Sequence, residues 1–185
     1  CNTLGCQDCF FVFLDIRFEP EEESRLYYNY RGESYRLLRE QYEPGYSERN
    51  SAIKGGVPYM AVVESFILDN LPKKAIEDLT LLDFGGDTGV NTPFKDSVRK
   101  CCNFDISRGQ ETVPQESERF DLVVLANVIE HVGDPLALLR TVSKFLRSDS
   151  ILYLETPLEK LIEDSETRGE PPNLTEKRHW HEHVN

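Results

Sequence analysis

The chain has 185 residues, 39% of them hydrophobic, which is enough for one sizeable domain and a small appendage. Its formal net charge of -12 would repel nucleic-acid phosphates and anionic lipids, so we expect neither nucleic acid nor membrane as a partner. No apolar run approaches the roughly 18 residues that span a bilayer. No secretory signal is visible either, which favours a cytoplasmic protein.

The first 50 residues are predicted to form a cysteine-bearing segment and a helical cap, ahead of a core over residues 51–185. Five cysteines without a signal peptide favour a reducing compartment, where metal binding is more common than disulfide formation. Cys6 and Cys9 are spaced so that both thiolates can bind one Zn²⁺, with Cys1 as a third ligand. A closed structural site needs four ligands and no fourth is obvious, so structural zinc and unligated cysteines both stay open.

Residues 20–43 predict two short helices that break at Gly32. Pro20 and the three glutamates after it suit a helix N-terminus, where proline fits and acids interact favourably with the helix dipole. Five tyrosines lie between Tyr27 and Tyr42. They can either pack this helical layer onto a core or line a substrate mouth.

The next predicted helix covers residues 57–72, with an apolar face formed by Tyr59, Val63, Phe66 and Ile67. The further predicted elements are a strand over 79–84, a helix over 92–100, a strand over 101–107, a strand over 120–128, a helix from 135 and a strand over 151–157. Because strands alternate with helices, we predict an α/β fold with a mostly parallel sheet flanked by helices. Ligands of such sheets bind at the carboxyl ends of the strands.

The stretch LLDFGGDTGV, residues 81–90, ends a predicted strand at an acid and enters a glycine-rich turn. Glycines permit a tight turn and let a ligand approach the backbone closely. The dinucleotide-binding pattern fails here, because Asp87 and Val90 occupy the positions of its second and third glycines. A P-loop is excluded as well, since no Gly-Lys-Ser/Thr sequence follows.

Carboxylates beside this turn favour a cationic ligand. Asp83, Asp87 and Asp105 are predicted to lie near one crevice at the strand ends. Asp105 follows Asp83 by 22 positions (105 − 83), close to the spacing of about 20 residues at which an acid binds a ribose in related nucleotide folds. A ligand with a ribose and a positive charge, but without a phosphate, fits both observations.

Four ordered motifs resemble the Rossmann-like S-adenosylmethionine-dependent methyltransferases, namely LLDFGGDTG, FDIS, FDLVVLANVIEHVGDPLALL and LYLETP. The resemblance is to the group with ubiquinone-pathway O-methyltransferases and sugar or natural-product methyltransferases. It implies S-adenosyl-L-methionine as cofactor and methyl transfer to a hydroxyl or carbon of a small-molecule acceptor. The residues that match the family's cofactor-binding positions are Asp83, Gly85, Gly86, Gly89, Asp105, Ala126 and Asn127.

Histidines supply the candidate catalytic bases. His131 lies just past the strand over 120–128, where it can orient the loop or remove a hydroxyl proton from the acceptor. Near the end of the chain, His179, His181 and His183 alternate with other residues and share one face if the backbone is extended. They can bind a metal, a cation or substrate, or lie in a solvated loop, and His181 or His183 is a second hypothesis for the base.

Three features depart from the family pattern. Asp87 replaces the middle glycine of the turn, which is expected to narrow the pocket and weaken cofactor binding. The stretch after the second predicted strand is too short for the expected third one, so adenine contact falls to Glu111, Glu116 or Glu118. Two more strands are expected after residue 157, so we expect the sequence either to be truncated or to omit disordered segments.

Two other functions compete with a methyltransferase. The N-terminal stretch CQDCFFVFLDIRF resembles the cysteine zinc knuckle of some group members. Together with Asp87, this motivates the alternative of a non-catalytic, zinc-bearing binding module with a degenerate fold. A nicotinamide oxidoreductase is disfavoured by the spacing of the glycines.

Overall fold

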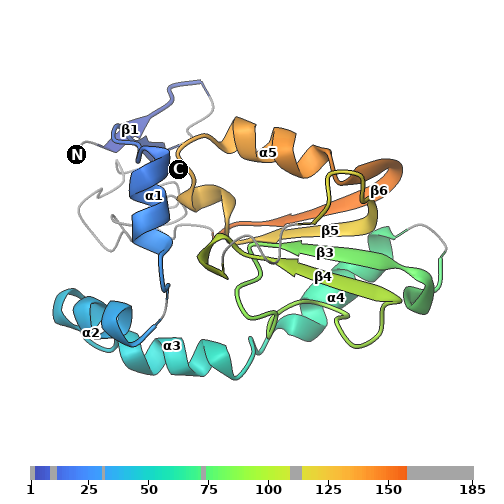
Figure 1. The fold of residues 1–185 in the computed structure, drawn as a ribbon, viewed down its shortest axis with the longest axis horizontal. Helices are drawn as coiled ribbons and strands as arrows, with labels where there is room; N and C mark the ends of the chain where they lie inside the picture. Colours follow the sequence, from blue (N-terminus) through green and yellow to red (C-terminus); the bar gives the residue numbers. More distant parts are fainter. Residues whose placement is uncertain (1–2, 9–11, 31, 72–73, 109–113, 158–185) are drawn as a thin grey trace.

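The computed structural model describes residues 3–8, 12–30, 32–71, 74–108 and 114–157 (Figure 1). Its helices and strands in chain order are β1 (Thr3–Gly5), β2 (Val12–Leu14), α1 (Pro20–Tyr27), α2 (Glu33–Tyr42), α3 (Tyr46–Lys54), α4 (Met60–Asn70), β3 (Thr80–Phe84), β4 (Lys100–Phe104), β5 (Phe120–Ala126), α5 (Pro135–Ser143) and β6 (Leu146–Glu155). Within these described residues, no helix is both long and apolar enough to cross a membrane.

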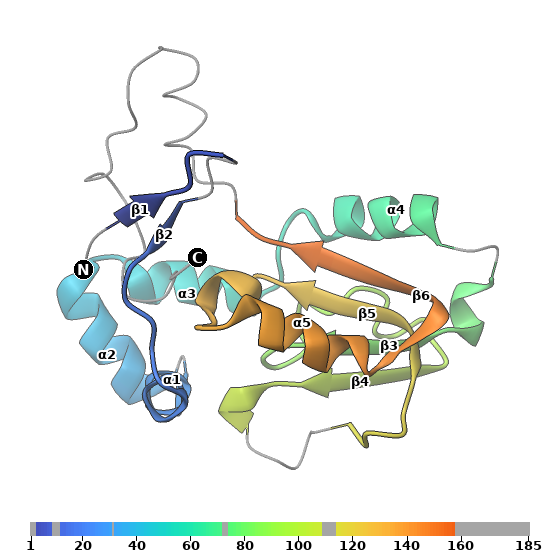
Figure 2. The same cartoon turned by 90° about the horizontal axis from the view of Figure 1, so that it is seen from above.

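The main sheet has four parallel strands in the order β4-β3-β5-β6, which confirms the predicted α/β fold. Side chains of β3 and β5 alternate between two core clusters. The helices α4 and α5 cover opposite faces of the sheet (Figure 1 and Figure 2). The cluster under α4 contains Val63, Ile67, Leu81, Leu122 and Val124. The cluster under α5 contains Leu82, Phe120, Val123, Leu125 and Val142. Covering both faces explains why β5 is an unbroken apolar run rather than an alternating one.

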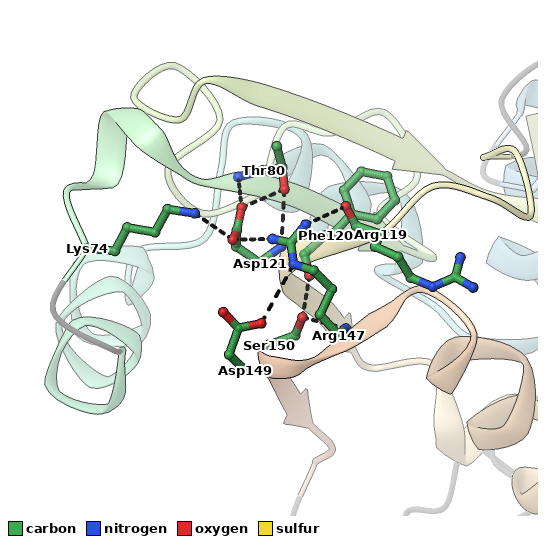
Figure 3. A network of polar contacts seen from close by, with 8 residues as sticks. All are labelled: Lys74, Thr80, Arg119, Phe120, Asp121, Arg147, Asp149 and Ser150. Atoms are coloured by element: carbon green, nitrogen blue, oxygen red, sulfur yellow. Dashed lines mark hydrogen bonds and ion pairs between the residues drawn. The ribbon is translucent and has the colours of Figure 1, made fainter.

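A polar network joins β3, β5 and β6 at the end of the sheet opposite the glycine turn (Figure 3). Thr80 donates from its backbone N and its Oγ1 to Oδ2 of Asp121, both at 2.7 Å. Lys74 Nζ lies 2.7 Å from Oδ1 of the same carboxylate, and Arg147 also contacts Oδ1. Burial raises the pKa of Asp121, but these hydrogen bonds outweigh it and hold the pKa well below its usual range.

The N-terminal region forms a β1–β2 hairpin followed by three helices. As predicted, α1 and α2 are separate, and Gly32 directly precedes α2. Arg39 is only 8% exposed, because its guanidinium lies over the Tyr46 ring at 4.9 Å and contacts Glu43. Tyr46 begins α3, a helix that hydrophobic periodicity does not predict because its sequence YSERNSAIK has no apolar stripe.

The helix predicted over residues 92–100 is wrong, because these residues form turns that lead into β4. Phe94 has φ 53°, a left-handed conformation that a right-handed helix cannot contain. The face predicted for α4 is right only in part. Val63 and Ile67 are buried, whereas Phe66 is 59% exposed and lies against the Tyr153 ring with 6.1 Å between centroids.

Candidate cofactor and active site

A pocket of about 920 Å³ lies at the carboxyl ends of all four parallel strands. This volume is within the range of small-molecule sites. The site residues predicted from the sequence that line it are Asp83, Gly85, Gly86, Asp105, Ala126, Asn127 and His131. The wall opposite the strand ends comes from the N-terminal helices, including Tyr27, Tyr30, Tyr46 and Asn50. The N-terminal tyrosines therefore both pack together and line the pocket.

The glycine turn depends on left-handed backbone at alternating positions. Gly85 has φ 91° and Gly89 has φ 75°, and Gly85 N donates to Phe104 O on β4 at 2.7 Å. Asp87, between them, has φ 48°. Aspartate is one of the few non-glycine residues that adopt this conformation without a large strain. The turn thus keeps its shape despite the missing glycine, with the Asp87 side chain as an addition to the pocket wall.

Asp83 packs against the glycine turn. Its side chain is buried, accepts a hydrogen bond from Thr92 Oγ1, and lies directly under Gly86. A Cβ on Gly86 would be 2.2 Å from Oδ2 of Asp83, so only glycine fits above this carboxyl. Burial raises the pKa of Asp83 to about 6, and the nearby charge of Asp105 adds to this effect.

Asp105 joins the turn to the residues that follow β4. Its Oδ2 accepts from Asp87 N at 2.8 Å, and its Oδ1 accepts from Ser107 N at 2.8 Å and Ser107 Oγ at 2.6 Å. A carboxylate offers about four acceptor positions, so one position on Oδ2 is left for a ligand. Asp105 can therefore accept one further hydrogen bond from a ligand rather than two.

Gly89, a predicted cofactor-binding residue, packs against β4 and does not line the pocket, so its contact with a cofactor stays a prediction. A Cβ at this position would be 2.7 Å from Asn103 Nδ2. The same amide donates to Gly86 O at 3.3 Å. Gly89 therefore shapes the turn from outside the pocket.

Glu155, at the end of β6, is a pocket residue that the sequence analysis assigned no role. Tyr59 OH and Asn127 Nδ2 donate to its Oε1 at 3.2 and 3.3 Å, and Tyr153 OH donates to its Oε2 at 2.7 Å. Burial and the Glu155 carboxylate both raise the pKa of each phenol. The rule that ligands bind at the carboxyl ends of strands could have found Glu155, since it ends the LYLETP strand.

Glu130 and His131 form a second pair in the pocket wall, in the short turn Ile129–His131. Glu130 is 3% exposed, and neither carboxyl oxygen has a hydrogen-bond partner of ordinary geometry among the described residues. His131 Nε2 lies 3.8 Å from Oε1 of Glu130. Burial raises the pKa of Glu130 to about 7, and the charge of Glu155 adds to it, against smaller lowering contributions from its own backbone and from Thr156.

Replacing Glu130 by glutamine should stabilise the protein at alkaline pH. A raised folded-state pKa means that ionisation of Glu130 penalises the native state, from the ordinary value of 4.5 up to about 7. Glu130→Gln should then exceed the wild type in free energy of unfolding by on the order of 1–3 kcal/mol above about pH 7, and by little near about pH 4. Urea unfolding at both pH values tests this. A difference in free energy of unfolding that is the same at both pH values would contradict this prediction. Glu77→Gln, the same change at an exposed site, serves as the control.

The remaining predicted metal ligands and catalytic bases, apart from Cys6, lie outside the described residues. These are Cys1 and Cys9 of the cysteine segment and His181 and His183 of the tail. Cys6 is described, but no group of three metal-ligating side chains occurs in the described part of the chain. Zinc binding and a role for the tail histidines therefore stay predictions.

Comparison with known proteins agrees with the fold. A model of the methyltransferase domain family matches residues 59–185, which is more than half of the chain. No match to a curated protein is found. The matched region begins at Tyr59 and includes the whole parallel sheet and the glycine turn. The chain therefore belongs to the methyltransferase domain family, whose members transfer methyl groups from S-adenosylmethionine.

Proposed function

We propose that this methyltransferase acts on a hydroxyl or carbon of a small molecule, such as a sugar, quinone-like or natural-product intermediate. The observation that supports it is the pocket, where the glycine turn and Asp105 border a space large enough for a nucleoside and a second molecule. The subgroup with ubiquinone-pathway and sugar methyltransferases is part of this proposal. It rests on the motifs quoted above.

When bound, S-adenosylmethionine supplies a methyl group that its sulfonium already makes electrophilic. The chain's own residues then have to bind the cofactor and the methyl acceptor, orient them towards each other and exclude water from the pocket. Asp105 would accept a hydrogen bond from one ribose hydroxyl of the cofactor, and Gly85 and Gly86 would let the cofactor approach the backbone. The carboxylates of the turn favour a positively charged ligand over a phosphate-bearing one.

His131 is the proposed general base when the methyl group is transferred to a hydroxyl. Its imidazole lines the pocket, and the Glu130 carboxyl beside Nε2 stabilises an imidazolium once that carboxyl is ionised. The raised pKa values of Tyr59 and Tyr153 make the pocket phenols poor bases near neutral pH. A carbon acceptor would need the same base to form an enolate-like nucleophile.

Calorimetry with S-adenosylmethionine, S-adenosylhomocysteine and NADH separates this function from its alternatives. We expect the first two to bind and NADH not to bind. Absence of binding by all three would favour the non-catalytic module, in which zinc on the cysteine segment would be structural. Binding of NADH alone would refute the proposal.

Asp105→Ala should weaken the binding of S-adenosylhomocysteine by about 1–3 kcal/mol, the range for a hydrogen bond to a charged group. The loss has two sources, because the variant removes the ribose acceptor and also frees Asp87 N, which shapes the turn. Ser107→Ala is the matched control, since it removes one donor to Asp105 but keeps the carboxylate. Unchanged affinity in Asp105→Ala would mean that the ribose lies elsewhere.

A further inference from the structure

The carboxylate of Glu155 is held rigidly at the pocket wall by neutral donors. They come from three places in the fold: Tyr59 just before α4, Asn127 just after β5, and Tyr153 on β6 itself. Asn127 adopts φ 54°, and its backbone N also donates to Glu155 O at 2.9 Å. Hydrogen bonds therefore position both the backbone and the side chain of Glu155.

Among the described residues, three donors reach this carboxylate, which leaves one acceptor position without a partner from this part of the chain. Oε1 takes two hydrogen bonds and Oε2 takes one, of the about four that a carboxylate can accept. No lysine, arginine or histidine forms an ion pair with Glu155 within the described ranges of the chain. Its charge is thus oriented but left without a counter-ion from those residues.

The surrounding pocket adds to this negative charge. The other acids that line it include Asp87, Asp105 and Glu23. The arginines in the lining, Arg39 and Arg49, both contact the same carboxylate, that of Glu43. A pocket with this balance attracts cations and repels anions such as phosphates.

The tyrosines that hold Glu155 also suit a cation. Both tyrosines line the pocket, and tyrosine rings can attract an ammonium group. The Glu155 carboxylate beside them provides a negative charge and a hydrogen-bond acceptor. A neutral hydroxyl would use the acceptor but not the charge.

We propose that Glu155, with Tyr59 and Tyr153, binds a positively charged nitrogen of a ligand in this pocket. The site rests on the proposed function, because the ammonium can belong either to the amino-acid end of the cofactor or to an amine-bearing acceptor. Both sources share the same chemistry. The acids of the turn around Asp105 then serve the nucleoside, while Glu155 serves the charged end of a ligand.

Glu155→Gln tests the site because it removes the charge and keeps an acceptor oxygen in nearly the same volume. Titration calorimetry would compare S-adenosylhomocysteine with methylthioadenosine, which has the same nucleoside but no amino-acid end. If the ammonium belongs to the cofactor, the variant should lose at least tenfold in affinity for S-adenosylhomocysteine and stay within about twofold for methylthioadenosine. Glu77→Gln, the same change at an exposed site outside the pocket, should alter neither.

The second arm uses cyclohexylammonium and neutral cyclohexanol as probes, with binding followed by NMR. The wild type should prefer the cation, and Glu155→Gln should abolish that preference if the ammonium belongs to the acceptor. Tyr59→Phe removes one donor and keeps the charge, so it should keep the preference even if Glu155→Gln fails to fold.

Two outcomes are decisive. Glu155→Gln that leaves both S-adenosylhomocysteine and cyclohexylammonium within twofold of the wild type would overturn the ammonium site. A wild type that does not bind S-adenosylhomocysteine or methylthioadenosine would refute the proposed function instead. In that case the preference for cyclohexylammonium still decides whether Glu155 binds a cation.

Discussion

Asp121→Ala is expected to lower the free energy of unfolding by about 1–3 kcal/mol, the usual effect of leaving a buried donor without its acceptor. Asp121 is 9% exposed and connects three strands of the sheet. Its loss leaves Thr80 N without an acceptor and places Lys74 and Arg147 next to each other without the carboxylate between them. Chemical denaturation at neutral pH measures the difference.

The pH dependence of this difference follows from the lowered pKa of Asp121. A depressed folded-state pKa contributes stability above the unfolded pKa, and that stability is lost as the pH falls through the folded pKa. The gap between wild type and Asp121→Ala should therefore narrow as the pH falls from about 5 towards about 2. A gap that is constant over this range would mean that the carboxylate contributes through packing and not through charge.

Asp149→Ala is the matched control for Asp121→Ala. Asp149 Oδ1 lies 3.7 Å from Arg147 Nε, and the Asp149 side chain is 78% exposed. Exposed ion pairs contribute about 0–1 kcal/mol, so this variant should be close to the wild type. An equal loss in both variants would show that Arg147, rather than the buried carboxylate, organises the network.

The sequence predicts the sheet well because a strand covered on both faces has a composition that can be read locally. The apolar run at β5 follows from burial alone, and so does the helix α5 between β5 and β6. Asp83 and Asp105 are likewise brought to one pocket by a general rule, that parallel strands present their carboxyl ends at the same edge. The parts of the site on these ends are therefore predictable.

The polar partners are not predictable in the same way. Tyr59 and Glu155 are 96 positions apart, and Lys74 and Asp121 are 47 apart. No local pattern indicates which donor will reach which carboxylate over such separations. The left-handed conformation of Phe94 is equally invisible in the sequence, and it is the reason why the predicted helix after the glycine turn does not form.

Gly85→Ala is expected to distort the turn and to weaken both stability and cofactor binding. Gly85 has φ 91°, where an L-residue costs about 1–3 kcal/mol. The new Cβ would also be 2.4 Å from Cγ2 of Val128, and overpacking of this kind costs about 1–3 kcal/mol. The two costs together predict a loss of about 2–6 kcal/mol in urea unfolding, with weaker binding of S-adenosylhomocysteine.

A double variant separates these two costs. Val128→Ala in the Gly85→Ala background removes the clashing methyl groups, so it should recover the packing cost and leave the backbone cost. Gly5→Ala is the control, because a Cβ at Gly5 would have no atom within 4 Å. Gly85→Ala that stays within about 0.5 kcal/mol of the wild type, the range of an ordinary surface substitution, would show that the turn can adopt another conformation. In that case the shape of the pocket at the strand ends would not depend on the left-handed backbone at Gly85.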